Sequence, residues 1–135
     1  MEDSVGKAKL KVCSEHLASS TKTGKLKILS SAVLASLMEE AAFKALETAC
    51  LISGQTSITS KMNVTYQRPS ALGANLSAVA RVTDIDKNGI HFEIEAFDET
   101  GLIGTATHTR VFVDKLDFEK NCYETARLAR RIKTK

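Results

Sequence analysis

The chain has 135 residues, of which 43% are hydrophobic and 26% are charged, and its formal net charge is +3. This length suits one domain with a sizeable core and is too short for two ordinary domains, so we expect a single domain over residues 1–135. The modest charge comes without an aromatic-studded basic strand, and no apolar run reaches the roughly 20 residues of a membrane span. The first residues lack the basic and then apolar pattern of a signal peptide. We therefore expect a cytoplasmic protein that binds neither nucleic acid nor a membrane.

The cysteines and histidines give no sign of a metal site or of a disulfide framework. The cysteines are Cys13, Cys50 and Cys122, an odd set without a Cys-x-x-Cys pair. Such a set predicts reduced and mostly buried side chains. No pair of histidines has the spacing of metal ligands, so we predict no metal and no resident cofactor.

The first predicted element is a strand over residues 7–12, where charged and apolar residues alternate. Ala8, Leu10 and Val12 share one face, which indicates a half-exposed strand. A polar connection follows over residues 19–25. Residues 26–29 then lead into the next element.

A long helix is predicted from residue 30 onward. Ser30 or Ser31 is the expected N-cap, because a serine hydroxyl can accept a hydrogen bond from the free backbone donors of the first turn. The helix is expected to end near residues 52–54, where Gly54 supplies a stop signal. Apolar residues cover most of its circumference when successive residues advance by about 100°. This helix is too apolar to lie on a surface and predicts a central, buried position.

Two adjacent glutamates on this helix have different surroundings. Glu40 falls on the polar side with Ser36 and Lys44, whereas Glu39 falls on an apolar flank between Ala35 and Phe43. A carboxylate on an apolar flank is a candidate functional group. The alternative is that Glu39 pairs with a lysine or arginine at an interface.

Beyond residue 55 the hydrophobic period changes from helical to alternating. Four strands rich in Val, Ile, Thr and Phe are predicted, over residues 56–66, 74–85, 90–97 and 102–114. Hairpin turns are predicted at residues 86–89, where Asn88-Gly89 suits a tight turn, and at residues 98–101. Short hairpins impose antiparallel pairing. Pro69 marks a looser connection.

The order of elements predicts an α+β fold in which an antiparallel β-sheet wraps around the long central helix. A C-terminal helix is predicted over residues 117–132, with Phe118, Cys122, Ala126 and Ala129 or Arg130 along one stripe. The basic residues at its end are typical of a solvated helix end.

Three motifs resemble those of a known enzyme family. They are Leu37-Met38-Glu39-Glu40-Ala41-Ala42 on the helix, Val64-Thr65-Tyr66 on the next strand, and Gly-x-x-x-His-x-Arg at residues 104–110. Together with the order of elements they resemble the hotdog-fold acyl-CoA thioesterases, and more narrowly the fluoroacetyl-CoA-specific thioesterase-like branch. The resemblance implies a hotdog core over about residues 5–118 and a helical tail over about residues 117–135.

The resemblance also implies a catalytic group. In that branch a threonine eight residues before the helix glutamate, the glutamate itself and a histidine on the following strand act together. Their places fall on Ser31, Glu39 and Tyr66, and Ala32 stands where a proline commonly follows the threonine. A tyrosine does not act as a general base near neutral pH as an imidazole can. The resemblance therefore supports fold and ligand class better than one particular mechanism.

Thioester chemistry gives each of these positions an expected role. The backbone N–H groups that follow Ser31, beginning with Ala32, can stabilise an oxyanion at the positive end of the helix dipole. Glu39 can activate a water molecule or attack the carbonyl carbon directly. Tyr66 fits a pocket wall or a hydrogen-bond donor to the carbonyl better than a proton carrier. Ser31 is also interpretable as a simple N-cap.

Further residues are assigned to substrate binding or to structure. Arg68 and Arg110 are expected to bind the substrate or its coenzyme A part, and Arg110 has an interface carboxylate as its alternative partner. His108 is interpreted as a structural hydrogen-bonding residue. Lys25 and Lys27 could meet the phosphates of coenzyme A, although solvated loop lysines are the usual case.

The resulting hypothesis is a homodimeric, possibly higher-order, hotdog enzyme that hydrolyses a small acyl-CoA. In hotdog proteins two sheets join edge to edge and the active sites form at the subunit boundary, which implies that Glu39 of one subunit faces Tyr66 or Arg68 of the other. The alternative is a non-catalytic hotdog module that binds acyl-CoA or a related small ligand. A third option, hydration of an enoyl thioester, lacks an Asp/His dehydratase pattern.

Overall fold

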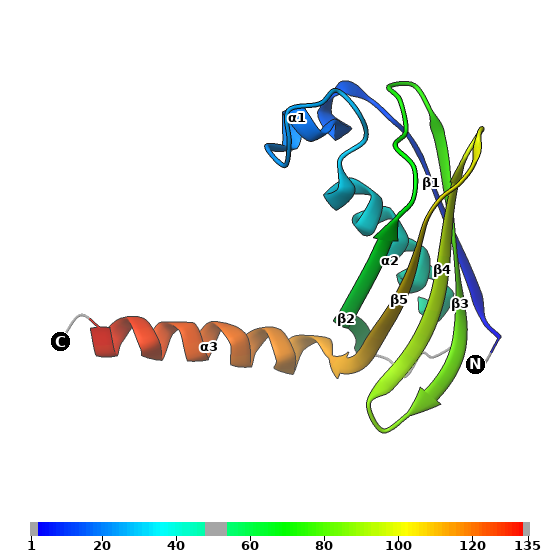
Figure 1. The fold of residues 1–135 in the computed structure, drawn as a ribbon. Coiled ribbons are helices and arrows are strands. Elements are labelled where there is room, and N and C mark those ends of the chain that lie inside the picture. The colour runs from blue at the N-terminus through cyan, green and yellow to red at the C-terminus, as the bar shows by residue number, and fades with distance from the viewer. Residues whose placement is uncertain (1–2, 48–53, 134–135) are drawn as a thin grey trace.

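A computed structural model describes residues 3–47 and 54–133 of the chain (Figure 1). The helical elements are the 3-10 turn η1 (Ser14–His16), α1 (Ala18–Thr21), α2 (Ser31–Glu47) and α3 (Lys115–Lys133). The strands are β1 (Val5–Lys11), β2 (Gln55–Tyr66), β3 (Asn75–Asp86), β4 (Gly89–Asp98) and β5 (Gly101–Asp114). The four strands predicted after the helix are confirmed to within one residue at each end. The predicted end of the central helix, and Cys50, lie outside the described residues, apart from Gly54.

All five strands form one antiparallel sheet in the order β1-β3-β4-β5-β2. The sheet curls around α2, as Figure 1 shows, and β1 and β2 are its edges. This arrangement confirms the predicted α+β fold with its wrapped central helix and its C-terminal helix.

The core lies between α2 and the concave face of the sheet. The helix contributes the buried residues Leu34, Leu37, Met38, Ala41, Ala42, Ala45 and Leu46. On β4 the alternation is the predicted one, since Ile90, Phe92, Ile94 and Ala96 are all buried. Apolar side chains at every second strand position and at helical spacing on α2 therefore build one continuous core.

Close packing of α2 on β1 depends on one glycine. A Cβ atom built on Gly6 would collide with the carbonyl oxygen of Ala41 and come within 2.5 Å of the backbone nitrogen of Ala45. Backbone atoms of a buried helix cannot move aside as a flexible side chain can. Gly6 thus lets the edge strand approach the helix backbone directly.

Both tight hairpins use the pattern Asp-x-x-Gly and not an Asn-Gly pair at the centre of the turn. Gly89 and Gly101 have φ angles of 136° and 122°, whereas the only described non-glycine residues with positive φ are Asp3 and Lys22. Asn88 is therefore not in the left-handed region, which corrects the predicted role of the Asn-Gly pair. In each turn the aspartate accepts a backbone N–H two residues on, at 2.8 Å for Asp86 and 2.7 Å for Asp98.

The edge strand β2 carries a β-bulge between Thr59 and Lys61. Successive side chains on a strand point to opposite faces, so Thr59 and Tyr66, seven residues apart, would lie on opposite faces of a regular strand. The extra residue, Ser60, reverses the alternation. As a result Thr59 and Tyr66 both reach α2, as their hydrogen bonds show.

The C-terminal helix α3 continues from the end of β5 and projects away from the body of the molecule (Figure 1). Its predicted apolar stripe is not buried in this chain, since every residue among positions 115–132 is exposed except Ala126, which is partly buried. In the part of the chain that the structure describes, no helix is long and apolar enough to cross a membrane. Among the same residues, no three His, Cys, Asp or Glu side chains gather as metal ligands would.

Candidate active site

The first part of the candidate site is the N-terminus of α2. The carbonyl of Ser30 accepts the first bond of the helix, from the N–H of Leu34 at 3.1 Å, so Ser30 holds the N-cap position. Ser30 is itself buried, and its own N–H donates to the carbonyl of His16 at 2.8 Å. The N–H groups of Ser31, Ala32 and Val33 precede the first intrahelical bond. They form the positive end of the helix dipole and suit an anionic oxygen.

A cavity of about 290 Å³ lies at this helix end, lined by residues 28–31, Leu34 and residues 66–70. Tyr66 is half exposed, and its hydroxyl donates to the carbonyl oxygen of Ser31 at 3.2 Å. Arg68 donates to the carbonyls of Thr100 and Leu102, at 2.7 and 3.2 Å, and so braces the β4–β5 turn beside the cavity. The structure thus brings together three of the predicted residues, Ser31, Tyr66 and Arg68, with Ala32 next to them on the helix.

Glu39 lies on α2 eight residues after Ser31, which is about 12 Å along the helix axis. Its side chain is half-buried, and its Oε2 accepts a hydrogen bond of 2.7 Å from the hydroxyl of Thr59 on β2. Neighbouring Glu40 is exposed and pairs with Lys44 at 2.8 Å. Each glutamate therefore has the surroundings that the helical wheel predicts.

Arg110 is a buried arginine on β5 that lies behind Thr59. It donates to the hydroxyl of Ser57 at 2.8 Å, to the carbonyl of Ser57 at 2.9 Å and to the hydroxyl of Thr59 at 3.2 Å. Its guanidinium also stands 5.6 Å from the centre of the Phe43 ring. Burial lowers the pKa of Arg110, and the charge of Glu39 opposes that shift. Arg110 is thus a buried positive charge held beside Thr59, the hydrogen-bond partner of Glu39.

His108 completes this group from the same strand. It is 2% exposed, and its Nδ1 lies 2.9 Å from the carbonyl of Lys61, which can only accept a hydrogen bond. Burial lowers the pKa of His108, although the hydrogen bond to Lys61 and the charge of Glu39 act in the opposite direction. A neutral ring with its proton on Nδ1 can then accept at Nε2 from Arg110, at 3.3 Å.

The directions of these bonds follow from donor chemistry. An arginine only donates, so the oxygen of Thr59 accepts from Arg110 and its single proton is directed to Glu39. The carboxylate oxygen Oε2 is accordingly held as an acceptor, and Oε1 is left for a further ligand. We call Arg110, Thr59 and Glu39 the Glu39 relay.

Comparison with known proteins identifies the family of this chain. The family model described as fluoroacetyl-CoA-specific thioesterase matches residues 12–116. The chain belongs to this thioesterase family. It is thus a thioester hydrolase with the hotdog fold, and the predicted resemblance is confirmed.

Solved structures share the fold of this chain. A thioesterase superfamily member from Thermus thermophilus superposes with a TM-score of 0.84 at 22% identity, over 100% of this chain and 97% of the other. The fluoroacetyl-CoA thioesterase FlK gives a TM-score of 0.83 at 15% identity, over 92% and 96% of the two chains. A hot-dog-like protein from Thermanaerovibrio acidaminovorans gives 0.81 at 21% identity, over 92% and 91%. No curated protein sequence matches the chain.

In this thioesterase the predicted site residues fall into two separate groups within one chain. Ser31, Tyr66 and Arg68 line the cavity at the start of α2, whereas Glu39 and Arg110 meet at the middle of the helix. The donors of Arg110 are directed at groups of its own chain, so a contact with coenzyme A stays a prediction. The structural interpretation of His108 agrees with its buried hydrogen bonds.

The sequence analysis missed Thr59 and Ser57, which hold Glu39 and Arg110. Both residues lie in a stretch of the edge strand that is rich in Ser and Thr, so their residue types do not distinguish them from their neighbours. The bulge that turns Thr59 toward α2 changes no hydrophobic pattern in that stretch.

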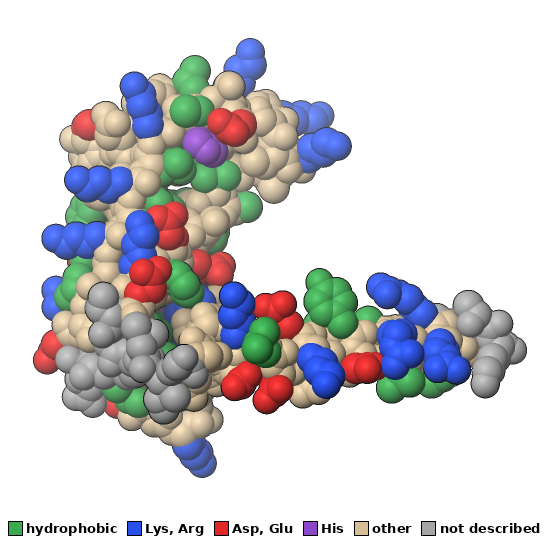
Figure 2. All heavy atoms as spheres, turned by 180° about the vertical axis from the view of Figure 1, so that it is seen from behind, with side chains coloured by type: hydrophobic (Ala, Val, Ile, Leu, Met, Phe, Trp, Pro, Cys, Tyr) green, Lys and Arg blue, Asp and Glu red, His purple; other side chains and the backbone are tan. Residues whose placement is uncertain are grey.

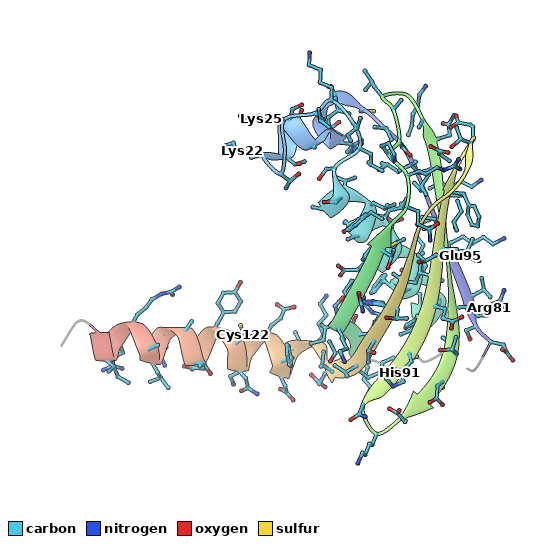
Figure 3. The ribbon with its side chains drawn as sticks, in the orientation of Figure 1. Lys22, Lys25, Arg81, His91, Glu95 and Cys122 are labelled. Carbon is cyan, nitrogen blue, oxygen red and sulfur yellow. The ribbon has the colours of Figure 1, made fainter. Side chains whose placement is uncertain are left out.

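A second cavity, of about 400 Å³, lies on the other face of the sheet and is lined by residues of β2, β3, β4 and β5, among them Arg81 and Glu95. Figure 3 shows these two side chains on the side of the sheet away from α1. The cavity includes no helix N-terminus and no residue of the Glu39 relay. The predicted residues Ser31, Tyr66 and Arg68 all line the smaller cavity.

Proposed function

We propose that this thioesterase hydrolyses a small acyl-CoA, with the thioester carbonyl at the N-terminus of α2 and with Glu39 as the base or nucleophile. The observation that supports this most directly is the helix end, where Ser30 and Ser31 line the cavity beside Tyr66 and the N–H groups of Ser31, Ala32 and Val33 precede the first intrahelical bond. These donors suit the oxyanion that forms when the carbonyl carbon becomes tetrahedral. A volume of about 290 Å³ fits a small acyl group with the end of its pantetheine arm.

In the proposed reaction Glu39 removes a proton from a water molecule, and the water oxygen attacks the acyl carbon. The negative charge develops on the carbonyl oxygen at the helix end. When the carbonyl re-forms, the C–S bond breaks and the coenzyme A thiolate leaves, to take up a proton from solvent or from Glu39. Direct attack by Glu39 would instead give a mixed anhydride that water then hydrolyses.

Tyr66 stands where the resemblance places a histidine, and its hydroxyl can donate one hydrogen bond. In the free chain that bond goes to the carbonyl of Ser31. We infer that a bound thioester competes for this donor, so that Tyr66 orients the carbonyl and does not carry the proton.

We further propose that two copies of the chain share each site. The edge strand β2 has no neighbour beyond it in the sheet order, and it can pair with a second β2 about a two-fold axis. Within one chain Glu39 lies about 12 Å along α2 from Ser31, which is too far for one water molecule to join them directly. A second, antiparallel copy of α2 would bring its Glu39 toward the Ser31 end of the first.

The test is release of free thiol from a panel of short, branched and aromatic acyl-CoAs. Glu39→Gln is expected to lose hydrolysis, because the amide can neither accept the proton nor attack. The matched control is Glu40→Gln, one residue along on the exposed side of the same helix, and it should keep wild-type rates. Unchanged hydrolysis in Glu39→Gln would remove the catalytic assignment.

The same panel tests the alternative of a non-catalytic acyl-CoA-binding module. Binding without thiol release across the panel would support it, and activity gained in Tyr66→His would then identify the tyrosine as the residue that silences the site.

A further inference from the structure

Exposed apolar surface is concentrated at two distant places in this chain. Among the described residues, five exposed large hydrophobic side chains lie on α3, namely Leu116, Phe118, Tyr123, Leu128 and Ile132. Three more, Leu26, Tyr66 and Leu72, lie on the segments around the cavity at the start of α2. We call residues 14–28 and 66–74 together the α1 end. Patches of this kind mark interaction surfaces.

The helix α3 has little support from its own chain. It contacts β5 where it begins, and Figure 1 shows the rest of it standing clear of the domain. Helices in proteins gain most of their stability from packing an apolar face, and α3, with 19 residues, has almost no such packing in its own chain. A partner surface for α3 is therefore expected.

The position of α3 at the edge of the sheet indicates which part of a second copy would contact this helix. Gln55, at the start of β2, pairs with Asp114, the last residue before α3, and the N–H of Lys115 donates to the carbonyl of Gly54 at 2.9 Å. Two β2 strands paired antiparallel about a two-fold axis place the start of one beside the end of the other. The end of β2 is Tyr66, so α3 of one copy begins beside the α1 end of the second.

The shape of the molecule agrees with this placement, since the space-filling view shows it hollowed between α3 and the α1 end (Figure 2). The two surfaces are not of opposite charge. The helix α3 carries six basic residues against three acidic ones, and residues 22–27 of the α1 end carry three lysines, of which Figure 3 shows Lys22 and Lys25 at its tip. The exposed apolar side chains of the two surfaces, and not their charges, therefore favour the contact.

We propose that α3 of one copy packs on the α1 end of a second copy and covers the cavity at the start of that copy's α2. The proposal rests on the two-copy site proposed above and goes beyond it, since it gives each cavity a wall from the other chain. The family model ends at residue 116, so almost all of α3 lies outside the matched region. The helix is thus an element by which this chain closes the shared site.

Cross-linking between two single-cysteine chains tests the contact. One chain keeps Cys122, midway along α3, with Cys13 and Cys50 replaced by serine. The other has all three native cysteines replaced by serine and carries Leu72→Cys at the α1 end. Co-refolded and treated with a short bismaleimide, the pair should give a cross-linked heterodimer. The matched control replaces Leu72→Cys with Arg81→Cys, which lies on the outer face of the sheet and should give none.

Other outcomes would overturn the proposal. Cross-linking of the Cys122 chain to itself, without the Leu72→Cys chain, would show that α3 pairs with a second α3. A dimer in sedimentation velocity without any heterodimer cross-link would exclude the α3 contact but not the two-copy site. A monomer that still hydrolyses acyl-CoA would exclude both the α3 contact and the two-copy site.

Discussion

At the scale of single residues, Thr59 holds the carboxylate of Glu39 in position. The hydroxyl of Thr59 links Arg110 to Oε2 of Glu39 through bonds of 3.2 and 2.7 Å. Thr59→Val keeps the shape and removes the link, and a hydrogen bond to a charged group contributes about 1.5–3 kcal/mol. We expect kcat for thiol release to fall roughly 10- to 100-fold.

Thr59→Ser restores the hydroxyl and serves as the control, with kcat expected within a few-fold of wild type. Because Thr59 is exposed in the single chain, neither variant should change the urea midpoint greatly. Equal rates in Thr59→Val and wild type would show that the relay does not position the carboxylate.

His108 predicts how stability depends on pH. Burial holds the pKa of His108 below its usual value of 6.5, so the folded chain keeps the ring neutral at a pH where the unfolded chain protonates it. The unfolded state then binds more protons, and stability rises with pH up to about 6.5 and is level above it. Urea midpoints across this range measure the slope, which His108→Asn should flatten. An equal slope in wild type and His108→Asn would contradict the assignment.

At the level of elements, alternation and turn residues were enough to predict every strand after the helix. The wheel of the central helix also separated Glu39 from Glu40. The bulge at Ser60 could not be predicted, because residues 59–61 are all polar and an extra residue there changes no hydrophobic pattern. Since the bulge decides which side chains face α2, the sequence revealed the carboxylate but not the threonine that holds it.

The contact between β1 and α2 gives a prediction at this scale. Gly6→Ala places a methyl group against the backbone of Ala41 and Ala45, and overpacking of this kind costs about 1–3 kcal/mol or more. Urea unfolding should therefore show a clear loss in the free energy of unfolding. Gly24→Ala is the matched control, because its Cβ would lie at an ordinary contact distance of 3.5 Å from the Cβ of Ala18. A loss as large in Gly24→Ala would mean that glycine flexibility, and not packing, is responsible.

For the whole molecule, the division of the predicted residues into two groups is the main structural result. The helix end offers donors for an oxyanion but no base, and the Glu39 relay offers a base but lies about 12 Å along the same helix. In the proposed dimer, an antiparallel copy of α2 from a second chain would supply what each group lacks. The open edge of β2 and the projecting α3 both lie on the side where such a copy would pair.

Complementation between two inactive chains tests this division directly. One chain carries Glu39→Gln, and the other carries Ser31→Ala together with Tyr66→Ala, which removes two of the polar side chains that line the cavity. If each site takes Glu39 from one chain and the helix end from the other, a heterodimer contains one intact site and one site with both defects. Equal mixing makes half of the dimers heterodimers, so thiol release should recover to about a quarter of wild type. Sites contained within single chains would stay inactive at every mixing ratio, because no chain in the mixture is intact.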